Sequence, residues 1–533
     1  MNILSLHTSH HDANFCTLKD GSIIYHNEIE RFTRIKHDGC FLPGFKERLN
    51  QTLESSNIFN EQYDHISYVF CRDRNISSYL DLSKFNGNPK VHYIGHHTSH
   101  ASSAFYNSNF DNALVFSIDG GGEEYQRDGD IFYWYTYSNC IFLGDKNQIT
   151  LLTNGSNIVN SLGGIWMEML EKVFDMSTIL GTKGDEAGTL MAMAAFGNPY
   201  KYLEEFRFLL EKSSDHLRFD YLKNEIKKDE ENRFHIAASL QRFTEDYFMN
   251  YVIMNLDRSQ TKNVCFTGGV SLNCVALGKV AKALIERGYN VFCDQAPNDS
   301  GLSLGAAKYL WHHILGNPRN IETQNSYLGR TYTESEINES LNNRTDLEVI
   351  KNVKLSDIVE LLMGSKIISL FNQGSESGKR ALGNRSIVAD PRFGYMKEFV
   401  NEKVKHRKGY RPFAPSVLRE HVSEWFEFDI DSPYMSFAIP VKKNKLHLVP
   451  AILHEDNTAR LQTVTHKDNG YYYNLISLFY EKTGVPMLLN TSFNNQEPIV
   501  ETPKNALDCF ANTQIDYLYF VQEELLVSKK TLK

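Results

Sequence analysis

Histidines and aspartates are the first candidates for chemistry in this 533-residue chain. His96 and His100 lie four residues apart, so on a helix both imidazoles project from one face and could share a metal ion. That spacing alone is more often found in solvated or hydrogen-bonded histidines. Asp119, at the end of a predicted strand, and Asp299, just before a predicted helix, add two carboxylates. Together the four residues predict a mixed nitrogen and oxygen site compatible with iron, manganese or zinc, and their spacing does not choose among these metals.

Two glycine-rich turns after apolar strands are candidates for binding phosphate. The strand predicted at 113–118 runs into Asp119-Gly120-Gly121-Gly122-Glu123, which we expect to form a flexible loop whose backbone N–H groups approach a phosphate. The strand predicted at 264–266 leads through Gly268 and Gly269 to Asn273 and a helix, which is a plausible nucleotide-contacting turn. A close packing turn between strand and helix is an equally weighted alternative for this second segment.

Positive charge is concentrated in the last third of the chain. Ten cations lie between residues 379 and 411, namely Lys379, Arg380, Arg385, Arg392, Lys397, Lys403, Lys405, Arg407, Lys408 and Arg411. Most such runs are solvated faces, but here glycines and prolines between the cations indicate a defined loop that suits a triphosphate-sized anion. Downstream, the apolar strand 488–489 ends in Asn490, Thr491 and Ser492, which suit phosphate or carbonyl oxygens or simply cap the strand end.

Composition and charge indicate an ordinary soluble globular protein. The chain is 41% hydrophobic, and 56 Lys and Arg against 65 Asp and Glu give a net charge of -9, which excludes a wholly basic, nonspecific nucleic-acid binder. The eight cysteines are dispersed without a CxxC spacing, which favours a reducing cytosol. Neither a signal-peptide pattern nor a run of about 18 apolar residues occurs. We therefore predict a cytoplasmic protein without a membrane span.

The elements that must position these residues follow an α/β pattern over the first 320 residues. We expect a buried strand at 3–7, a hairpin of strands 14–18 and 22–27 that turns at Asp20-Gly21, and helices within 163–196 and 236–254. The polar stretch 316–344 is the predicted domain junction. A second unit then begins with an amphipathic helix near 356–363 and a strand at 366–371. No internal tandem repeat is visible in the sequence.

Seven motifs, in this order, make the chain resemble a known family. It is similar to the O-carbamoyltransferases of the nodulation and cephamycin type, which include the tobramycin enzyme, from about residue 3 to residue 525. The motifs are HHTSHASSAFY, FSIDGGGE, TGGVSLNC, PNDSGLSLGAA, RALGNRSIVADPR, RPFAPSVL and LLNTSFNNQEPIV.

The resemblance implies a fold and a reaction. An actin-like (ASKHA) metal- and nucleotide-binding domain is expected at 1–330, followed by a YrdC-like α/β domain at 345–533. In the family, the YrdC-like domain converts carbamoyl phosphate and ATP, supplied as Mg-ATP, to carbamoyl-adenylate. A substrate hydroxyl then attacks the carbamoyl carbon in the actin-like domain, and AMP leaves. The activation step is chemically reasonable because nitrogen donation makes a carbamoyl group a poor electrophile.

The resemblance also implies roles for residues. His96, His100, Asp119 and Asp299 would hold a divalent metal, iron(II) first with manganese and zinc as alternatives. His11 would be the general base on the acceptor hydroxyl, or would only bind phosphate or a metal-bound water. Lys36 would contact the adenylate, with a surface lysine as the alternative. Carbamoyl phosphate and ATP would be bound by Arg380, Lys405, Arg411, Arg460, Asn490 and Ser492.

The resemblance implies an acceptor that bears a hydroxyl group, by default a small natural product or sugar. Because the chain favours Lys, Asn, Ile and Tyr, as an AT-rich genome does, a hydroxymethylated pyrimidine in a nucleotide or in phage DNA is the alternative acceptor. A non-catalytic regulator that binds metal and nucleotide is the alternative from another class, and the retention of both residue sets argues against it. A homodimer is compatible with the sequence, which specifies neither the acceptor, the metal nor the oligomeric state.

Overall fold

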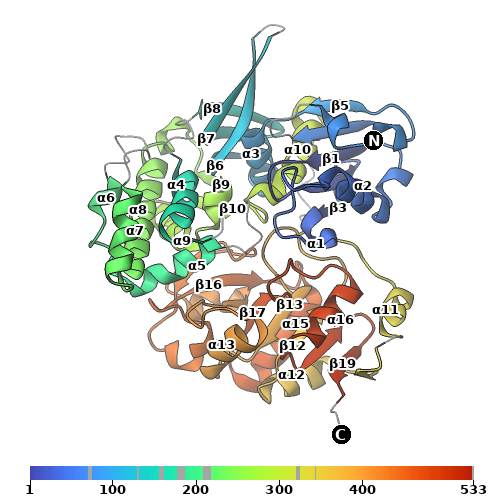
Figure 1. Ribbon diagram of the computed structural model, residues 1–533, viewed down its shortest axis with the longest axis vertical. Helices are drawn as coiled ribbons and strands as arrows, with labels where there is room; N and C mark the ends of the chain where they lie inside the picture. Colours follow the sequence, from blue (N-terminus) through green and yellow to red (C-terminus); the bar gives the residue numbers. More distant parts are fainter. Residues whose placement is uncertain are drawn as a thin grey trace. The chain divides into compact units, whose positions relative to one another are not determined.

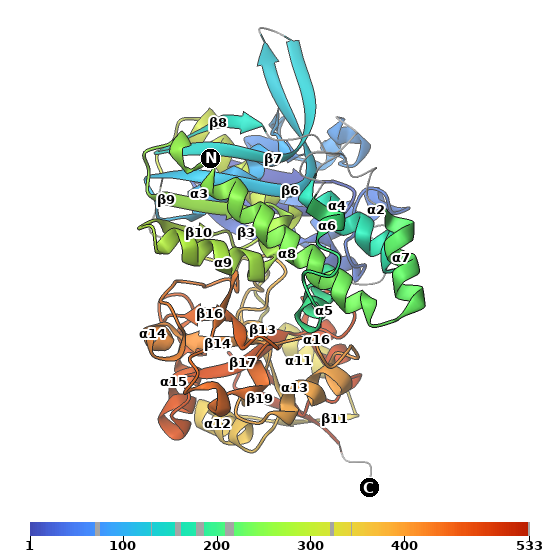
Figure 2. The same cartoon turned by 90° about the vertical axis from the view of Figure 1, so that its left-hand side faces the viewer.

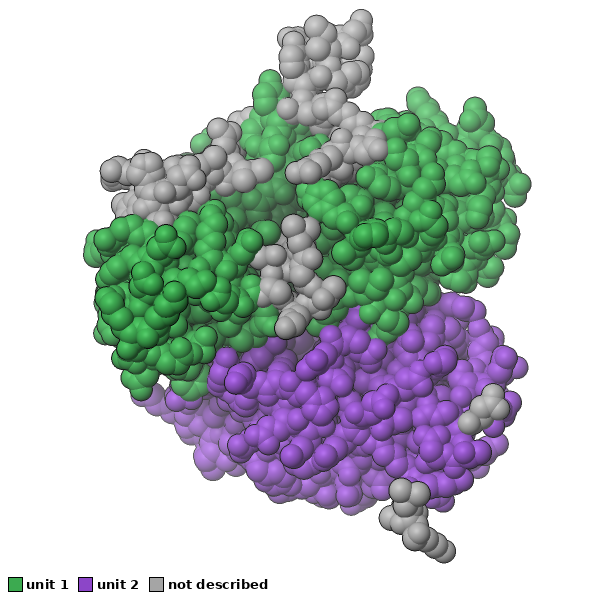
Figure 3. Space-filling model, in the orientation of Figure 1, with its two compact units in different colours: residues 1–324 green, residues 325–533 purple. Residues whose placement is uncertain are grey.

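The structure, a computed structural model, describes residues 1–69, 75–128, 131–154, 161–176, 186–207, 218–319, 325–342 and 344–530. The chain divides into two compact units, Met1–Gln324 and Asn325–Lys533 (Figure 3). This division lies within the polar stretch 316–344, but earlier than the predicted domain end at residue 330. The reason is that the Tyr327 hydroxyl donates to the Leu382 carbonyl (3.0 Å) and the Gly329 N–H to the Ser375 carbonyl (2.9 Å), which ties 325–330 to unit 2.

Unit 1 contains two five-stranded sheets with the same connectivity (Figure 1). In both sheets the first strand pairs antiparallel with the second and parallel with the fourth. The first sheet has the order β3-β2-β1-β4-β5, and the second β10-β9-β6-β7-β8. The strands are β1 (Asn2–His7), β2 (Asn14–Lys19), β3 (Ser22–Glu28), β4 (His65–Val69), β5 (Lys90–Tyr93), β6 (Asn112–Asp128), β7 (Ile131–Asp145), β8 (Gln148–Asn154), β9 (Asn263–Thr267) and β10 (Asn290–Cys293).

Two helices connect the halves of unit 1. Helix α3 (His96–Asn107) follows β5 of the first sheet but packs on β6 and β9 of the second. Helix α10 (Leu302–Tyr309) follows β10 of the second sheet but packs on β1, β2 and β4 of the first. The two helices cross closely at Gly305, where a Cβ atom would overlap the carbonyl oxygen of Ser99. Each half therefore covers the sheet of the other half.

Unit 1 confirms most of the predicted elements and corrects one. The hairpin β2–β3 turns at Asp20 (φ 48°) and Gly21 (φ 88°), the left-handed pair that a tight hairpin turn requires. Residues 119–123, predicted as a flexible loop, instead continue strand β6 to Asp128 with an irregularity between Ile118 and Gly122. The loop prediction was wrong because β7 is long enough to pair with this segment, for example Glu123 with Thr136, and the two strands extend beyond the others (Figure 2).

Eight further α-helices complete the described part of unit 1. They are α1 (Ile29–Thr33), α2 (Phe45–Ser55), α4 (Leu162–Glu168), α5 (Glu186–Met193), α6 (Glu204–Arg207), α7 (Phe219–Lys228), α8 (Asn232–Ile253) and α9 (Cys274–Ile285). Within the predicted helical range 163–196, residues 177–185 lie outside the described residues, and the range 236–254 falls mainly in α8. Among the described residues, no helix combines the length and the apolarity that a membrane crossing requires, and the seven described cysteines are free thiols.

Unit 2 is built on one nine-stranded mixed sheet. Its order is β11-β19-β18-β12-β13-β17-β14-β16-β15. The predicted helix at 356–363 is α12 (Leu355–Met363), and the predicted strand at 366–371 is β12 (Ile368–Phe371). The other strands are β11 (Leu347–Ile350), β13 (Arg385–Ala389), β14 (Ala414–Leu418), β15 (Phe437–Pro440), β16 (Thr458–Val464), β17 (Met487–Ser492), β18 (Tyr517–Phe520) and β19 (Leu525–Lys529). The other helices are α11 (Glu334–Leu341), α13 (Tyr395–Phe399), α14 (Val422–Trp425), α15 (Gly470–Thr483) and α16 (Pro503–Ala511). Both units are thus α/β, as predicted.

Candidate metal centre

Helix α3 carries both histidines of the candidate site, and strand β6 fixes where this helix begins. Its N-cap residue, Gly95, has no side chain to cap the first turn. The buried carboxylate of Glu124 does so instead, because it accepts the Thr98 N–H (2.7 Å) and the Thr98 hydroxyl (3.0 Å). A negative charge at a helix N-terminus also interacts favourably with the helix dipole. The second sheet therefore holds the helix that follows the first sheet.

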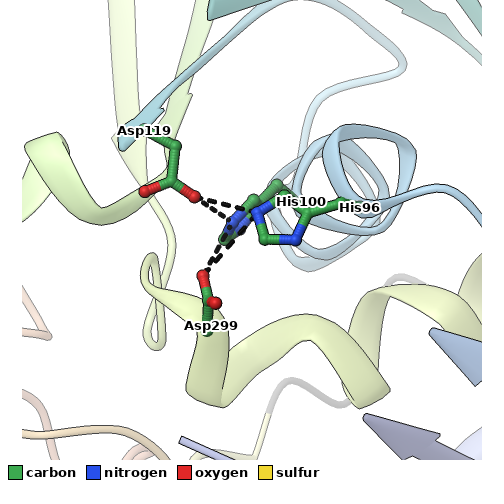
Figure 4. A group of neighbouring side chains, drawn as sticks. All are labelled: His96, His100, Asp119 and Asp299. Carbon is green, nitrogen blue, oxygen red and sulfur yellow. Dashed lines mark hydrogen bonds and ion pairs between the residues drawn. The ribbon is translucent and has the colours of Figure 1, made fainter. Parts of the chain in front are cut away.

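The four predicted ligands converge in the interior of unit 1 (Figure 4). The Nε2 atoms of His96 and His100 lie 2.9 and 3.0 Å from Oδ2 of Asp119. They lie 3.7 and 3.5 Å from Oδ1 of Asp299. One ligand atom from each of these buried residues lies within 4.8 Å of all the others. Bonds of about 2.0–2.2 Å to a shared ion place ligand atoms about 3–4 Å apart, so this donor set fits one divalent cation.

The predicted phosphate-binding glycines shape this cluster. Oδ1 of Asp119, the oxygen that points away from the histidines, accepts the N–H groups of Gly120 (2.7 Å) and Gly269 (3.1 Å). A Cβ atom at Gly122 would overlap the ring of His96, so only glycine leaves room for this ligand. These contacts fix the carboxylate and the imidazole.

Asn273 has a structural role in the turn between β9 and α9. Its Oδ1 caps α9 by accepting the Ala276 N–H (3.1 Å), and its Nδ2 donates to Gln241 (2.9 Å). The structure thus engages this side chain within unit 1. Nucleotide contacts of Gly120, Gly121, Gly268, Gly269 and Asn273 stay predictions.

The electrostatics of the cluster favour a positive charge between the two carboxylates. Burial lowers the pKa of His100, but hydrogen bonds and the charges of Asp119 and Asp299 outweigh it and raise this pKa to about 9. Burial raises the pKa of Asp299, yet the charge of His96 and the hydrogen bond from His100 bring it down to about 2. The pKa of Asp119 is likewise held well below its usual value by the two histidines despite burial. A proton and a divalent cation therefore compete for the same place.

His11, the predicted base, lies at the edge of this cluster. Its Nε2 is 3.9 Å from Oδ2 of Asp299, and its Nδ1 is 3.3 Å from Oδ2 of Asp12. Asp12 also accepts from Nδ1 of His37 (2.7 Å) and from Nδ2 of Asn298 (3.1 Å). The role of Asp12 as a partner of His11 was not predicted, although the two residues are adjacent in the sequence. Lys36 is half-buried next to His37, and its adenylate contact stays a prediction.

Asn14 connects this cluster to the end of strand β1. Its Nδ2 lies 2.8 Å from the Asp299 carbonyl oxygen, 2.7 Å from the Asp12 carbonyl oxygen and 3.1 Å from Nδ1 of His7. His7 is the last residue of β1 and is 1% exposed. Burial lowers the pKa of His7 to about 3, so the ring is neutral at physiological pH. Neither His7 nor Asn14 was predicted to lie at the site, because a polar residue at the end of a buried strand was the only signal in the sequence.

In unit 2 the structure brings several predicted anion-binding residues together. Nζ of Lys405 donates to the Ser492 carbonyl (2.6 Å) and lies 3.2 Å from the Ser492 hydroxyl. Nδ2 of Asn490, two residues earlier on β17, donates to the Ala381 carbonyl (3.0 Å) and to the Ser416 hydroxyl (2.9 Å). Arg380 is half-buried in the segment between β12 and β13, directly before Ala381.

Three arginines of unit 2 lie near one another. Burial lowers the pKa of Arg407 well below its usual value, and the charges of Arg411 and Arg460 lower it further. Arg407 donates through Nε to Oδ1 of Asn401 (2.7 Å), which is a neutral partner. Neighbouring guanidinium groups that depress one another's pKa are suited to a polyanion such as a phosphate chain. Arg407 was noted in the sequence only as part of a charge run.

Comparison with known proteins assigns the chain to a family. The family model described as Carbamoyltransferase N-terminus matches residues 47–308, and Carbamoyltransferase C-terminus matches 359–529. Nodulation protein NolNO of Sinorhizobium fredii is 31% identical over 568 residues, covering 98% of this chain and 79% of the relative. Nodulation protein NolO of Bradyrhizobium diazoefficiens is 33% identical over 449 residues, covering 80% and 77%. The chain belongs to the carbamoyltransferase family and is a transferase, which confirms the resemblance found in its motifs.

Among solved structures, full-length HypF in a phosphate- and nucleotide-bound form aligns over 59% of this chain and 56% of that chain. The TM-score is 0.37 at 16% identity. A likeness at this level adds nothing to the family assignment.

Proposed function

We propose that the protein is an ATP-dependent O-carbamoyltransferase that works through carbamoyl-adenylate. Carbamoyl phosphate is hydrolysed to carbamate and phosphate, and a carbamate oxygen attacks the α-phosphorus of ATP, which releases pyrophosphate. An acceptor hydroxyl then attacks the carbamoyl carbon, giving a carbamate ester and AMP. The observation that carries the proposal is the buried group of His96, His100, Asp119 and Asp299 in a chain of the carbamoyltransferase family.

We assign the transfer step to unit 1 and adenylate formation to unit 2. The repeated five-stranded connectivity of unit 1 supports an actin-like domain, and the YrdC-like assignment of unit 2 rests on the motif resemblance alone. The four ligands would hold iron(II), with manganese or zinc as alternatives. A divalent cation bound there supplies Lewis-acid polarisation of the reacting oxygen.

In the transfer step, His11 removes the proton from the attacking hydroxyl. Asp12 is an acceptor for the Nδ1–H of His11 (3.3 Å), which leaves Nε2 as the basic atom on the side of Asp299. Asp12 is itself held by His37 and Asn298, so the His11 ring has a fixed orientation. The proton therefore moves from the hydroxyl oxygen to Nε2 of His11 as the new C–O bond forms.

In the activation step, the cations of unit 2 neutralise the phosphates of both substrates. Arg407, Arg411 and Arg460 form the charged group, and Lys405 lies against Ser492 at the end of β17. Cationic side chains next to the α-phosphate and the departing pyrophosphate neutralise their negative charge, which lowers the barrier for nucleophilic attack at phosphorus. Arg380 and Asn490 are the further substrate-binding residues of this proposal.

The test is release of AMP and pyrophosphate from ATP by the full-length, iron-loaded protein, with and without carbamoyl phosphate and without acceptor. We expect AMP release that depends on carbamoyl phosphate. Lys405→Met should reduce it by at least about 100-fold because a phosphate-stabilising charge is lost, whereas the exposed Lys443→Met should not. Absence of AMP with iron(II), manganese and zinc, both alone and with a panel of alcohols, would overturn the proposal.

The acceptor is identified in the same assay by the mass gain of one carbamoyl group. Hydroxylated small molecules such as aminoglycosides and sugars form the first panel. Nucleosides and DNA containing hydroxymethylated pyrimidines form the second, because the composition of the chain raised that alternative. For any acceptor that reacts, the analogue lacking the hydroxyl is the matched control and should stay unmodified.

A further inference from the structure

The ammonium group of Lys405 in unit 2 is enclosed by oxygens from the end of β17. Lys405 is 3% exposed, and its Nζ lies 2.6 Å from the carbonyl oxygen and 3.2 Å from the hydroxyl of Ser492. Asn494, two residues further on, contributes its carbonyl oxygen at 3.0 Å and its side-chain Oδ1 at 2.6 Å. An ammonium group has three hydrogens, so four oxygens from one short segment leave it little freedom to move.

The orientation of the Asn494 amide is fixed from both of its ends. Its Nδ2 donates to the Glu497 carbonyl (2.7 Å), while its Oδ1 accepts from the Ser492 hydroxyl (2.7 Å) as well as from Lys405. The reversed amide would set its NH2 group against the ammonium and its oxygen against the Glu497 carbonyl, and both pairs are repulsive. Oδ1 of Asn494 is therefore the acceptor that joins the ammonium to the hydroxyl.

The backbone that carries Asn494 is held as well. The Phe493 N–H donates to the Arg385 carbonyl of β13 (2.8 Å), and the Asn494 N–H donates to the Ser492 carbonyl (3.0 Å). Phe493 itself is buried. Lys405, by contrast, comes from the segment after α13 and reaches this place with a long, flexible side chain. Asn494 thus fixes a flexible side chain from one segment against the end of a strand from another.

The Asn494 side chain holds the ammonium without a charge of its own. A carboxylate at the same position would form an ion pair with the ammonium and offset its positive charge. The amide oxygen instead keeps the ammonium in place and adds no negative charge beside it. Such an arrangement suits a cation that stabilises a phosphate group, because the cation is already positioned when the anion arrives.

We propose that Asn494 is a positioning residue of the phosphate site in unit 2, whose neutral amide oxygen holds the Lys405 ammonium beside the Ser492 hydroxyl. This inference rests on the proposed function, which assigns phosphate binding to Lys405 and Ser492. Asn494 acts through these two side chains rather than on the substrate. The neutrality of the amide is as important as its hydrogen bonds, because the charge of Lys405 is what attracts the phosphate.

The test measures binding of inorganic pyrophosphate to the full-length protein by calorimetry. Asn494→Asp keeps the size and the acceptor oxygen but adds a negative charge, and should weaken binding about 100-fold, as Lys405→Met does. Asn494→Ala removes the hydrogen bonds but adds no charge, and should weaken binding about 10-fold. Gln496→Glu is the control, because it adds the same charge at an exposed position two residues further on, and should stay within about 2-fold of the wild type.

The order of the two Asn494 variants separates positioning of a charge from structural support. If Asn494→Ala binds pyrophosphate as the wild type does, Lys405 keeps its place without Asn494 and the inference is wrong. It is also wrong if Asn494→Asp binds as tightly as Asn494→Ala, because the charge of Lys405 then does not act on the phosphate. The thermal midpoint of each variant is recorded alongside, and affinities that merely follow the midpoints would assign Asn494 to packing alone and overturn the inference.

The same measurements distinguish this inference from the proposed function. Pyrophosphate binding needs no turnover, so the expected order of affinities without any AMP formation would overturn adenylate synthesis and retain Asn494 as a positioning residue. AMP formation combined with the reverse order would overturn the inference alone. Absence of pyrophosphate binding by the wild type would overturn the phosphate site itself, and the role of Asn494 with it.

Discussion

The two halves of unit 1 have the same strand connectivity but supply different kinds of ligand to the candidate metal centre. His7, His11, His96 and His100 all come from the first half, that is, from β1, the segment after it and the helix after β5. The carboxylates Asp119 and Asp299 come from the second half, from β6 and from the segment after β10. The comparison teaches that two halves with one connectivity can build an asymmetric metal site, whose imidazole ligands come from the first half and whose carboxylate ligands come from the second.

Strand register shows how the equivalent positions diverge. The first residue pair between the parallel strands can be used to align the two halves. In the first half Ile3 of β1 pairs with His65 of β4, and in the second half Leu114 of β6 pairs with Val264 of β9. Counting forward, His7 in β1 is equivalent to Ile118 in β6. In the first half the chain then leaves the sheet, which allows His11 to reach the cluster. In the second half β6 continues to Asp128, which places Asp119 and Glu124 against helix α3.

The largest expected effect comes from removing a carboxylate of the second half. Asp119→Asn should reduce metal affinity by more than about 100-fold, which is the loss typical of removing a residue that only supports a ligand. The reason is that Oδ2 of Asp119 lies 2.9 and 3.0 Å from Nε2 of His96 and His100, as expected of a ligand of the same ion. Asp299→Asn, whose oxygen lies 3.5 and 3.7 Å from them, should cause a smaller loss. Metal content after gel filtration and the transfer rate check this, with the exposed Asp145→Asn as control. If Asp299→Asn lost more metal than Asp119→Asn, the expectation that Asp119 contributes more to metal binding would be wrong.

The next effect concerns the crossing of α3 and α10, the two helices through which each half of unit 1 packs on the sheet of the other half. Gly305→Ala should reduce the free energy of unfolding of unit 1 by about 1–3 kcal/mol, because the added Cβ overlaps the Ser99 carbonyl and forces the helices apart. Thermal unfolding of the metal-free protein measures this effect. Gly409→Ala, where a Cβ meets nothing within 4 Å, is the control. An unchanged midpoint for Gly305→Ala would mean that the helices separate without cost.

The charge balance between the halves predicts an opposite pH dependence for stability and for metal binding. The pKa of His100 is raised from 6.5 to about 9 in the folded protein, so its contribution is fully present below pH 6.5 and is lost as pH rises through 9. The metal-free protein should therefore lose at most about 3 kcal/mol of stability over this range, while metal affinity increases as the competing proton leaves. Denaturant unfolding and metal titration between pH 6.5 and 9 check the two trends, and parallel changes in both would contradict them.

The smallest expected effect concerns the cap that β6 supplies to α3. Glu124→Gln keeps the shape but removes the negative charge at the helix N-terminus, and should cost about 0.5–1 kcal/mol of stability. Metal affinity should fall slightly, because the helix carries both histidine ligands. Denaturant unfolding with Glu123→Gln as neighbouring control measures it. If Glu123→Gln lowers the free energy of unfolding more than Glu124→Gln does, the carboxylate of Glu124 is not the group that stabilises the N-terminus of α3.

Local pattern predicted the elements whose structure depends on neighbouring residues. The hairpin at Asp20-Gly21 follows from turn chemistry, and α12 and β12 follow from apolar periodicity. The prediction of a loop at 119–123 failed because pairing with β7 decided the conformation of those glycines. For the same reason Gly122 gave no local sign that its missing side chain makes room for His96.

By itself the sequence determined the types of ligand, the helical spacing that places His96 and His100 on one face, and the ordered motifs that identify the family. Only the tertiary structure decided that unit 1 repeats one connectivity without repeating a sequence, and that its imidazole and carboxylate ligands come together from two different halves. The physical reason is distance along the chain. Asn14 contacts Asp299 across 285 residues, and no local pattern encodes a hydrogen bond that exists only after both sheets have formed.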